Sequence, residues 1–261
     1  MSPPRPAGDA VAPLVARPEG SAVVLDFDGT LSPIVTEPAE ARPGGGAVEV
    51  LAALVTRFAL VAVVSGRPVD FLAPLVPEGV VLSGLYGLEV MRGDQRLDPA
   101  RAGVWREVVA HVARRSADHG PEGMVVEPKG LSLTLHYRAH PEAGPAVAEW
   151  ARRQAARSGL VARPAKMSVE LHPPIDADKG TALEQLVEGL GAVLFAGDDH
   201  GDLPAFDALD RLAGRGVDTV RVAVASAEAP RELVDRADVV VDGPAALVDL
   251  LRTLVPPADA G

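Results

Sequence analysis

The chain has 261 residues, no cysteine and a formal net charge of −11, from 25 Lys and Arg against 36 Asp and Glu. This length allows about one or two folded domains, and the lack of cysteine excludes disulfides, thiolate metal sites and cysteine nucleophiles. The acidic balance argues against a nucleic-acid-binding protein, which would carry a basic stripe.

The two ends of the chain are predicted to be flexible. Pro, Gly and polar residues dominate residues 1–18 and 256–261, and such segments bury little apolar surface. The first letters, MSPPRPAGDA, lack the basic start and apolar run of a signal peptide, and no apolar stretch approaches the roughly 18 residues that span a bilayer. We therefore expect a cytoplasmic protein with no membrane partner.

Short apolar runs alternate with helical patterns in the first and last parts of the chain. Runs without polar alternation are typical of buried parallel strands, and they occur at residues 22–25, 59–64, 193–196 and 220–224. Helical patterns occur at residues 48–57, 179–190, 203–214 and 245–254. This alternation predicts an α/β fold, with a Rossmann-like parallel-sheet core over residues 19–100 and 174–255.

The middle of the chain has a different pattern. Its expected elements follow the order αββαββ, at residues 101–117, 124–127, 131–138, 145–157, 160–163 and 166–172. The strands alternate apolar and polar residues with period two, which is typical of a sheet with one open face. We therefore predict a second domain over residues 101–173, inserted into the first, with helices on one face and an open polar face.

Two acids follow the first apolar strand, in the sequence DFDGTL at residues 26–31. Ligands of open α/β sheets bind beyond the carboxyl ends of the strands, so Asp26 and Asp28 are expected at that edge. Acids this close repel each other unless a cation binds or their pKa values separate. Gly29 would let backbone N–H groups approach an anion. The alternative is a turn with Asx capping, which needs no ligand.

Two further loops carry groups that suit a phosphate. Ser65, Gly66 and Arg67 follow the second strand, and a hydroxyl and a free N–H can bind phosphate oxygens. An ordinary polar loop explains this segment equally well. Lys179 opens a helix, where a cation is unfavourable against the helix dipole, and this indicates an anion nearby. A solvated surface lysine is the alternative.

A fourth segment, GDDHGD at residues 197–202, follows the strand at residues 193–196. Carboxylates at a strand end suit Mg²⁺, although Asp202 is also a candidate N-cap of the following helix. Because three parallel strands end in such loops, Asp26, Asp28, Ser65 and Asp198 are expected to meet at one edge of the sheet.

These four segments, in this order, resemble the motifs of haloacid-dehalogenase-type (HAD) phosphatases with an inserted C2-type cap. Longer segments are similar to the trehalose-6-phosphate phosphatases: LDFDGTLSPIVTEPAEARP, VVSGRP, GLYGLE, VEPKGLSLTLHYR, KMSVELHPP with the following DKG, and FAGDDHGDLPAF. They run from residue 25 to residue 206 and cover both predicted domains. The fourth motif departs from the pattern, because many members have Thr and an acid where this chain has Gly201 and Leu203.

The resemblance implies a phosphoric monoester hydrolase that works through an aspartyl phosphate. In this interpretation Asp26 is the nucleophile, and Asp28 is the general acid and base. Ser65, Gly66 and Lys179 bind the phosphoryl oxygens.

The resemblance also implies Mg²⁺ as the cofactor, and its ligands would be Asp26, Asp28 through the backbone carbonyl, Asp198, and Asp202 or Asp199 through water. The residues that it assigns to the substrate are Arg67, Glu127, Lys129 and Glu170. Independently, the period-two pattern places Glu170 on the open face of the second sheet. For the neighbouring His136, Arg138 and His172, simple solvation of that face is an equally good explanation.

The substrate that the resemblance implies is trehalose 6-phosphate, in trehalose biosynthesis, with a trehalose-6-phosphate synthase as a pathway neighbour. Another sugar phosphate such as sucrose 6-phosphate is an alternative. A sugar-phosphate-binding module without catalysis is a further alternative, although the intact Asp26, Asp28, Lys179 and Asp198 disfavour it.

Overall fold

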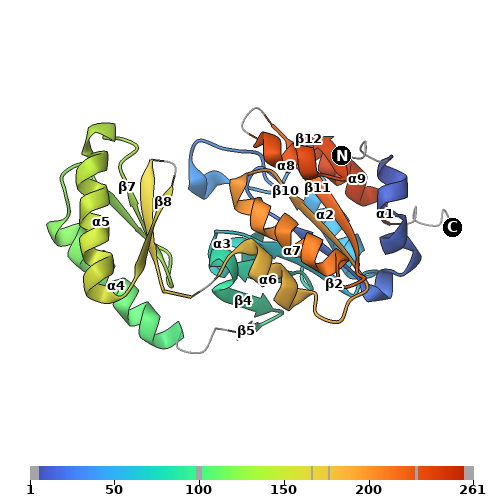
Figure 1. Ribbon diagram of the computed structural model, residues 1–261, viewed down its shortest axis with the longest axis horizontal. Coiled ribbons are helices and arrows are strands. Elements are labelled where there is room, and N and C mark those ends of the chain that lie inside the picture. The colour runs from blue at the N-terminus through green and yellow to red at the C-terminus, as the bar shows by residue number, and fades with distance from the viewer. Residues whose placement is uncertain (1–5, 98–101, 166, 176, 227–228, 256–261) are drawn as a thin grey trace. The chain divides into compact units, whose positions relative to one another are not determined.

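The computed structural model describes residues 6–97, 102–165, 167–175, 177–226 and 229–255 (Figure 1). The chain divides into two compact units. The first combines the residues up to Leu97 with those from Ala177 onward, and the second spans Asp98–Asp176. Within the described ranges, no helix combines the length and the apolar composition that a bilayer-spanning segment needs.

The first unit is built on a mixed sheet of eight strands. In spatial order they are β12 (Val239–Asp242), β11 (Asp218–Ala225), β10 (Ala192–Gly197), β1 (Ser21–Leu25), β2 (Leu60–Val64), β3 (Val81–Gly84), β4 (Glu89–Arg92) and β5 (Gln95–Leu97). Neighbours from β12 to β3 are parallel, and β4 and β5 complete the edge as antiparallel strands. The predicted parallel α/β sheet is confirmed.

Helices cover both faces of this sheet. One face packs against α1 (Ala7–Ala16), α2 (Ala47–Val55), α3 (Val69–Leu72) and α9 (Gly243–Arg252). The other packs against α6 (Lys179–Leu186), α7 (Leu203–Ala213) and α8 (Arg231–Arg236). In β1, Val23 and Leu25 join the first apolar cluster, whereas Ala22 and Val24 join the second. Burial on both faces explains why these strands are continuous apolar runs in the sequence.

The N-terminal helix corrects one expectation. Residues 7–16 form α1, and its Ala10, Val11 and Leu14 are buried in the core, so a flexible terminus over residues 6–18 is wrong. Residues 1–5 and 256–261 lie outside the described part of the chain. Pro and Gly in this segment masked a helical spacing of apolar residues. Pro13 lies inside α1, where the missing N–H removes one helical hydrogen bond, but the buried side chains outweigh that loss.

The second unit has the predicted αββαββ order. Helices α4 (Ala102–His119) and α5 (Gly144–Ser158) pack on one face of an antiparallel sheet, whose spatial order is β6 (Val125–Pro128), β7 (Leu133–His136), β9 (Ser168–His172) and β8 (Val161–Ala165). The expected first residues of α4 and β9, Arg101 and Lys166, are outside the described ranges. Leu133, Leu135, Val169 and Leu171 form the apolar face.

The opposite face of this sheet is less open than predicted. Ser132, Thr134, Ser168 and His172 are buried, although all four belong to the polar face. The Ser132 hydroxyl donates to Glu170 Oε1 at 3.1 Å, so the longer Glu170 side chain covers at least this residue. The period-two pattern identified the polar face correctly, but it contained no information on how deeply the residues of that face are buried.

Short 3₁₀ turns connect several of these elements: η1 (Pro18–Gly20), η2 (Pro38–Glu40), η3 (Ala73–Leu75), η4 (Leu85–Gly87), η5 (Pro141–Ala143) and η6 (His200–Asp202). The last of them lies at the carboxyl edge of the first sheet, between β10 and α7.

An ion-pair network on the α6–α7 face gives a testable pH dependence. Glu184 of α6 accepts hydrogen bonds from Arg211 at 3.0 Å and from Arg215 at 2.6 Å. The bond from Arg211 is the main cause that lowers the pKa of Glu184. A carboxyl with a lowered pKa in the folded protein stabilises it above the unfolded pKa, and this contribution is lost as the pH falls through the folded value.

We therefore expect Glu184→Gln to lower the free energy of unfolding at pH 7 by ~0.5–1 kcal/mol, because the pair is partly exposed. In urea titrations, the difference from the unmodified protein should stay constant from about pH 8 to 5 and shrink below about pH 4. Glu188→Gln, on an exposed residue just beyond α6, is the control. A difference that grew with acidity would contradict the assignment.

Candidate active site

The candidate catalytic residues follow three neighbouring strands of the first sheet. β1 lies between β10 and β2, and its Leu25 is paired with Ala196 of β10. All three strands are parallel, so the residues that follow them emerge at one edge. Asp26 follows β1, Ser65 follows β2 and Asp198 follows β10.

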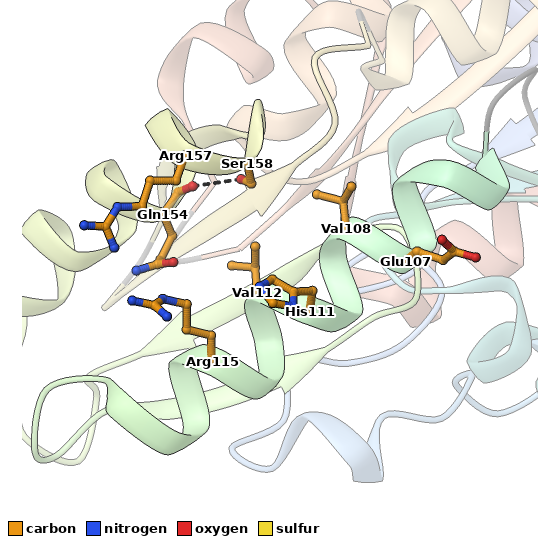
Figure 2. A pocket seen from close by; sticks show the side chains of 8 residues that line it. All are labelled: Glu107, Val108, His111, Val112, Arg115, Gln154, Arg157 and Ser158. Carbon is orange, nitrogen blue, oxygen red and sulfur yellow. Dashed lines mark hydrogen bonds between the residues drawn. The ribbon is translucent and has the colours of Figure 1, made fainter.

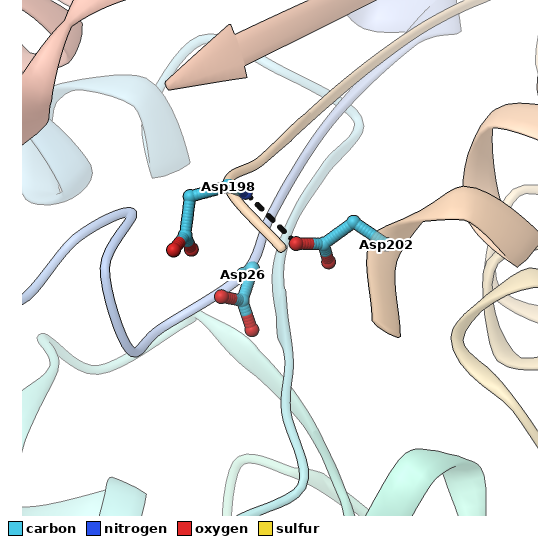
Figure 3. A group of neighbouring side chains, drawn as sticks. All are labelled: Asp26, Asp198 and Asp202. Atoms are coloured by element: carbon cyan, nitrogen blue, oxygen red, sulfur yellow. Dashed lines mark hydrogen bonds between the residues drawn. The ribbon is translucent and has the colours of Figure 1, made fainter. Parts of the chain in front are cut away.

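Three buried carboxylates meet at this edge (Figure 3). They belong to Asp26, Asp198 and Asp202, and one oxygen of each lies within 4.8 Å of the others. Asp202 joins the cluster from η6, because its Oδ2 accepts the N–H groups of Asp198 and Asp199 at 2.8 and 3.0 Å. Asp202 is the N-cap residue of α7, as the sequence indicated, but its side chain makes no capping bond to that helix.

Two glycines make room for these carboxylates. A Cβ on Gly29, which has a φ of 83°, would collide with the Asp198 carboxylate. A Cβ on Gly197 would collide with the Asp202 carboxylate. The N–H of Gly29 donates to the carbonyl of Ser32 at 2.8 Å. The sequence suggested that this N–H approaches a bound anion. The structure shows another use of Gly29, because its missing Cβ leaves room for the Asp198 carboxylate.

Lys179 provides the positive charge inside the cluster. It is the first residue of α6, it is buried, and its Nζ donates to Asp26 Oδ1 at 2.7 Å and to Asp202 Oδ1 at 2.6 Å. Burial alone would lower the pKa of Lys179, but the carboxylates of Asp202 and Asp26 outweigh burial and raise the pKa. The anion predicted near the start of this helix is therefore the pair of carboxylates of Asp26 and Asp202. The alternative interpretation of Lys179 as a solvated surface residue is wrong.

Burial is the largest cause that raises the pKa of all three carboxyl groups. The pKa of Asp198 rises to about 7, and repulsion from Asp202 and Asp199 contributes. With the Lys179 ammonium counted, the ionised cluster retains two uncompensated negative charges. One divalent cation would balance them. Hard oxygen donors at this spacing fit Mg²⁺.

Thr30 is a site residue that sequence reasoning did not single out. Its hydroxyl is buried and donates to Asp198 Oδ1 at 2.9 Å, which orients that carboxylate and lowers its pKa against the effect of burial. The available signal was its position in DFDGTL, two residues after Asp28. Nothing in the sequence showed that this hydroxyl faces a residue 168 positions away.

Asp28 is held apart from the carboxylate cluster by Arg67. The Arg67 guanidinium donates from Nε and from one terminal nitrogen to the two oxygens of Asp28, both at 2.8 Å. The same guanidinium lies 4.6 Å from the centre of the Phe71 ring. The backbone N–H of Arg67 donates to Ser65 Oγ at 3.1 Å. Arg67 thus links the loop that follows β1 to the loop that follows β2. Gly66 lies between Ser65 and Arg67 in the sequence.

The residues expected to bind a sugar lie on the polar face of the second unit. Glu127 of β6, Thr134 of β7 and Glu170 of β9 are directly paired across the sheet. Glu127 Oε2 lies 2.8 Å from His136 Nε2 and 3.6 Å from the Lys129 ammonium. Glu127, Lys129 and Glu170 therefore share one face. Thr134, which sequence reasoning did not assign to a ligand, lies between the two acids, and its buried Oγ1 has no hydrogen-bond partner among the described residues.

The fold is that of the haloacid dehalogenases. A haloacid dehalogenase-like hydrolase from Bacteroides thetaiotaomicron superimposes with a TM-score of 0.63 and 16% identity, over 90% of this chain and 99% of that one. The C-terminal domain of the Candida albicans trehalose-6-phosphate phosphatase superimposes with a TM-score of 0.73 and 22% identity, over 97% and 98% of the two chains. At these identities the likeness concerns the fold alone.

The sequence defines the family more narrowly. Residues 24–237 match the family described as trehalose-phosphatase, and the chain belongs to this family. A trehalose-phosphate phosphatase of Mycobacterium avium is 36% identical over 203 residues, which are 72% of this chain and 51% of the relative. The chain thus spans about half the length of that relative.

Replacement of the buried lysine tests the electrostatics of the cluster. Lys179→Met keeps a similar volume but leaves Asp26 and Asp202 buried without their counter-charge. We expect the free energy of unfolding, measured with urea at pH 7.5 in EDTA, to fall by ~3–5 kcal/mol. Lys129→Met, on a partly exposed lysine, should cost less than ~1 kcal/mol. Equal effects of the two substitutions would contradict the central role of Lys179.

Proposed function

We propose that this protein is a Mg²⁺-dependent phosphatase that hydrolyses trehalose 6-phosphate to trehalose and phosphate, in trehalose biosynthesis. The observation that carries the proposal is the buried cluster of Asp26, Asp198, Asp202 and Lys179 at the carboxyl edge of the sheet. Membership of the trehalose-phosphatase family supports the choice of substrate.

Four residues would hold Mg²⁺: Asp26, Asp198 and Asp202 with their carboxylates, and Asp28 with its backbone carbonyl. The support is the excess negative charge of the cluster and its oxygen donors. When bound, the ion supplies positive charge that orients the phosphoryl group and offsets its negative charge.

Asp26 is the proposed nucleophile. Its Oδ1 accepts a hydrogen bond from Lys179, which fixes the carboxylate and leaves Oδ2 to attack phosphorus in line. The new bond is an aspartyl phosphate, and the bond from phosphorus to the sugar oxygen breaks. Water then hydrolyses the aspartyl phosphate and regenerates Asp26.

Asp28 is the proposed general acid and base. It would protonate the departing sugar oxygen and later take a proton from the hydrolytic water. The two bonds from Arg67 hold Asp28 in one orientation, outside the metal-binding cluster, and this supports a separate role for the second acid.

The loop after β2 is the proposed phosphate-binding loop. Ser65 and Gly66 would bind phosphoryl oxygens together with Lys179, and Arg67 would contact the substrate. The Arg67 fork that pairs with Asp28 also has the geometry to bind a phosphate. Positioning and charge dominate catalysis of phosphoryl transfer, so these groups would act mainly by orienting the substrate.

Glu127, Lys129 and Glu170 are the proposed sugar-binding residues. Carboxylates accept hydrogen bonds from hydroxyls and an ammonium donates to them, so this face offers both kinds of partner. A site that pairs with hydroxyls discriminates against analogues that lack them, because its own polar groups are then left unpaired.

The proposed reaction also gives the protein a place in metabolism. A trehalose-6-phosphate synthase would supply the substrate, and it is the expected pathway neighbour. We place the enzyme in the cytoplasm, because a phosphorylated disaccharide carries charge that prevents it from crossing a bilayer unaided.

Asp26→Asn tests the nucleophile. We expect phosphate release from trehalose 6-phosphate with Mg²⁺ to fall by ~10³-fold or more, since an amide cannot form the aspartyl phosphate. EDTA should abolish release by the unmodified enzyme. Asp70→Asn, on an exposed acid, is the matched control, and circular dichroism checks that all variants fold. Release that persists in Asp26→Asn would refute the assignment, and no release by the unmodified chain from any sugar phosphate would favour a binding module.

The ratio of kcat/KM for trehalose 6-phosphate to that for glucose 6-phosphate tests the sugar-binding face. Glu170→Ala and Lys129→Ala should each reduce this ratio by ~10–100-fold, because each removes a partner of hydroxyls that glucose 6-phosphate lacks. Glu149→Ala, on a partly exposed residue of α5, should leave the ratio unchanged. An unchanged ratio in the first two variants would contradict the proposed face. Sucrose 6-phosphate in the same series tests the alternative substrate.

A further inference from the structure

The helical layer of the second unit contains a pocket that the proposed reaction does not use. Its volume is about 610 Å³, within the range of small-molecule sites (Figure 2). It is lined only by residues of α4 and α5: Glu107, Val108, His111, Val112, Arg115, Gln154, Arg157 and Ser158. Because α4 and α5 cover the apolar face of the sheet, this pocket does not involve the polar face with Glu127 and Glu170.

Gln154 is a buried polar residue whose side-chain NH₂ group has no partner in the described part of the chain. It is 2% exposed, and its Nε2 has no hydrogen-bond partner among the described residues. The nearby hydroxyl of Ser158 donates to the backbone carbonyl of Gln154 and not to the side chain. Figure 2 shows the Gln154 amide extending from α5 toward Arg115 of α4. Buried amides nearly always have partners, so this one indicates an acceptor that a ligand would supply.

Two arginines at the pocket carry charge that the described part of the chain does not compensate. Arg115 and Arg157 are exposed and form no ion pair with a described carboxylate. By contrast, Arg152 and Arg153 on the same helix as Arg157 both pair with Glu149, at 2.8 and 3.6 Å. The pocket therefore carries two guanidinium groups that are available to an anion.

The lining has a cationic end, an apolar middle and an end with one acidic side chain. In Figure 2, Arg115, Arg157 and the Gln154 amide gather at one end, and Glu107 lies at the other. Val108 and Val112 lie between them and offer an apolar surface. Two guanidinium forks and an amide present more donors than one carboxylate accepts, but they match the three terminal oxygens of a phosphomonoester.

We propose that this pocket binds a phosphomonoester of about the size of a sugar phosphate. Its phosphate would lie between Arg115 and Arg157, with the Gln154 amide as a further donor, and its body would lie against Val108 and Val112. A rotation about the terminal torsion of Gln154 is enough to turn its NH₂ group into the pocket. The site is separate from the proposed catalytic one, and it needs no turnover.

The probe is glucose 6-phosphate, with inorganic phosphate and uncharged glucose as comparisons, titrated into the full ¹⁵N-labelled chain. The background is Asp26→Asn, so that no probe is hydrolysed. The reporter is the side-chain NH₂ signal of Gln154 in the NMR spectrum, identified by its loss in Gln154→Leu. We expect a saturable shift of this signal with glucose 6-phosphate and none with glucose.

The double variant Arg115→Gln/Arg157→Gln should weaken this binding by ~10-fold or more. The matched double variant Arg152→Gln/Arg153→Gln should bind as before, and a dispersed spectrum shows that each variant folds. Equal affinity for inorganic phosphate would identify free phosphate as the ligand of the same oxyanion site.

No saturable shift up to ~10 mM of either phosphate would overturn the proposal. A shift that survives unchanged in Arg115→Gln/Arg157→Gln would also overturn it. The reporter and the catalytic variant are independent, so neither result depends on whether the protein hydrolyses trehalose 6-phosphate.

Discussion

The acidic edge of the first sheet depends on one buried ammonium. Lys179 donates to Asp26 and Asp202, and these three residues come from the end of β1, the start of α6 and the turn η6. Carboxylates so close together in a buried place repel each other and favour protonation. The ammonium offsets part of this cost and also fixes the distance between two segments that are far apart in the chain. A divalent cation would balance the remaining negative charge, so the same interaction supports the fold and the proposed chemistry.

The negative net charge of the chain is compatible with an anionic substrate, because most acidic groups near the proposed site have cationic partners or would bind a cation. Most arginines of the first unit have acidic partners, as Arg67 has Asp28 and Arg211 has Glu184. The three acids of the cluster are buried and would be neutralised by Lys179 and one divalent cation. A phosphate would therefore meet a locally neutral site in place of the negative average charge of the chain.

The sequence predicted the elements that repeat a pattern and missed those that depend on a single contact. Continuous apolar runs identified β1, β2, β10 and β11, because strands buried on both faces have no polar alternation. The edge with Asp26 and Asp198 followed from the parallel topology. By contrast, α1 was hidden by its Pro and Gly residues. The contacts of Thr30 and Arg67 join residues that are not neighbours in sequence, so no local pattern could contain them.

The first unit is constrained differently at the two points where the second unit is inserted. The outgoing connection leaves β5, an edge strand with exposed residues such as Leu97. The returning chain re-enters the first unit at Ala177, two positions before Lys179, and reciprocal bonds between Asp178 and Thr181 fix the start of α6. A change of length next to the exposed Leu97 would therefore disturb few contacts, whereas a change just before Asp178 would disturb the capped start of α6 that positions the ammonium. Variation in the length of the connections is therefore expected to accumulate on one side of the insertion only.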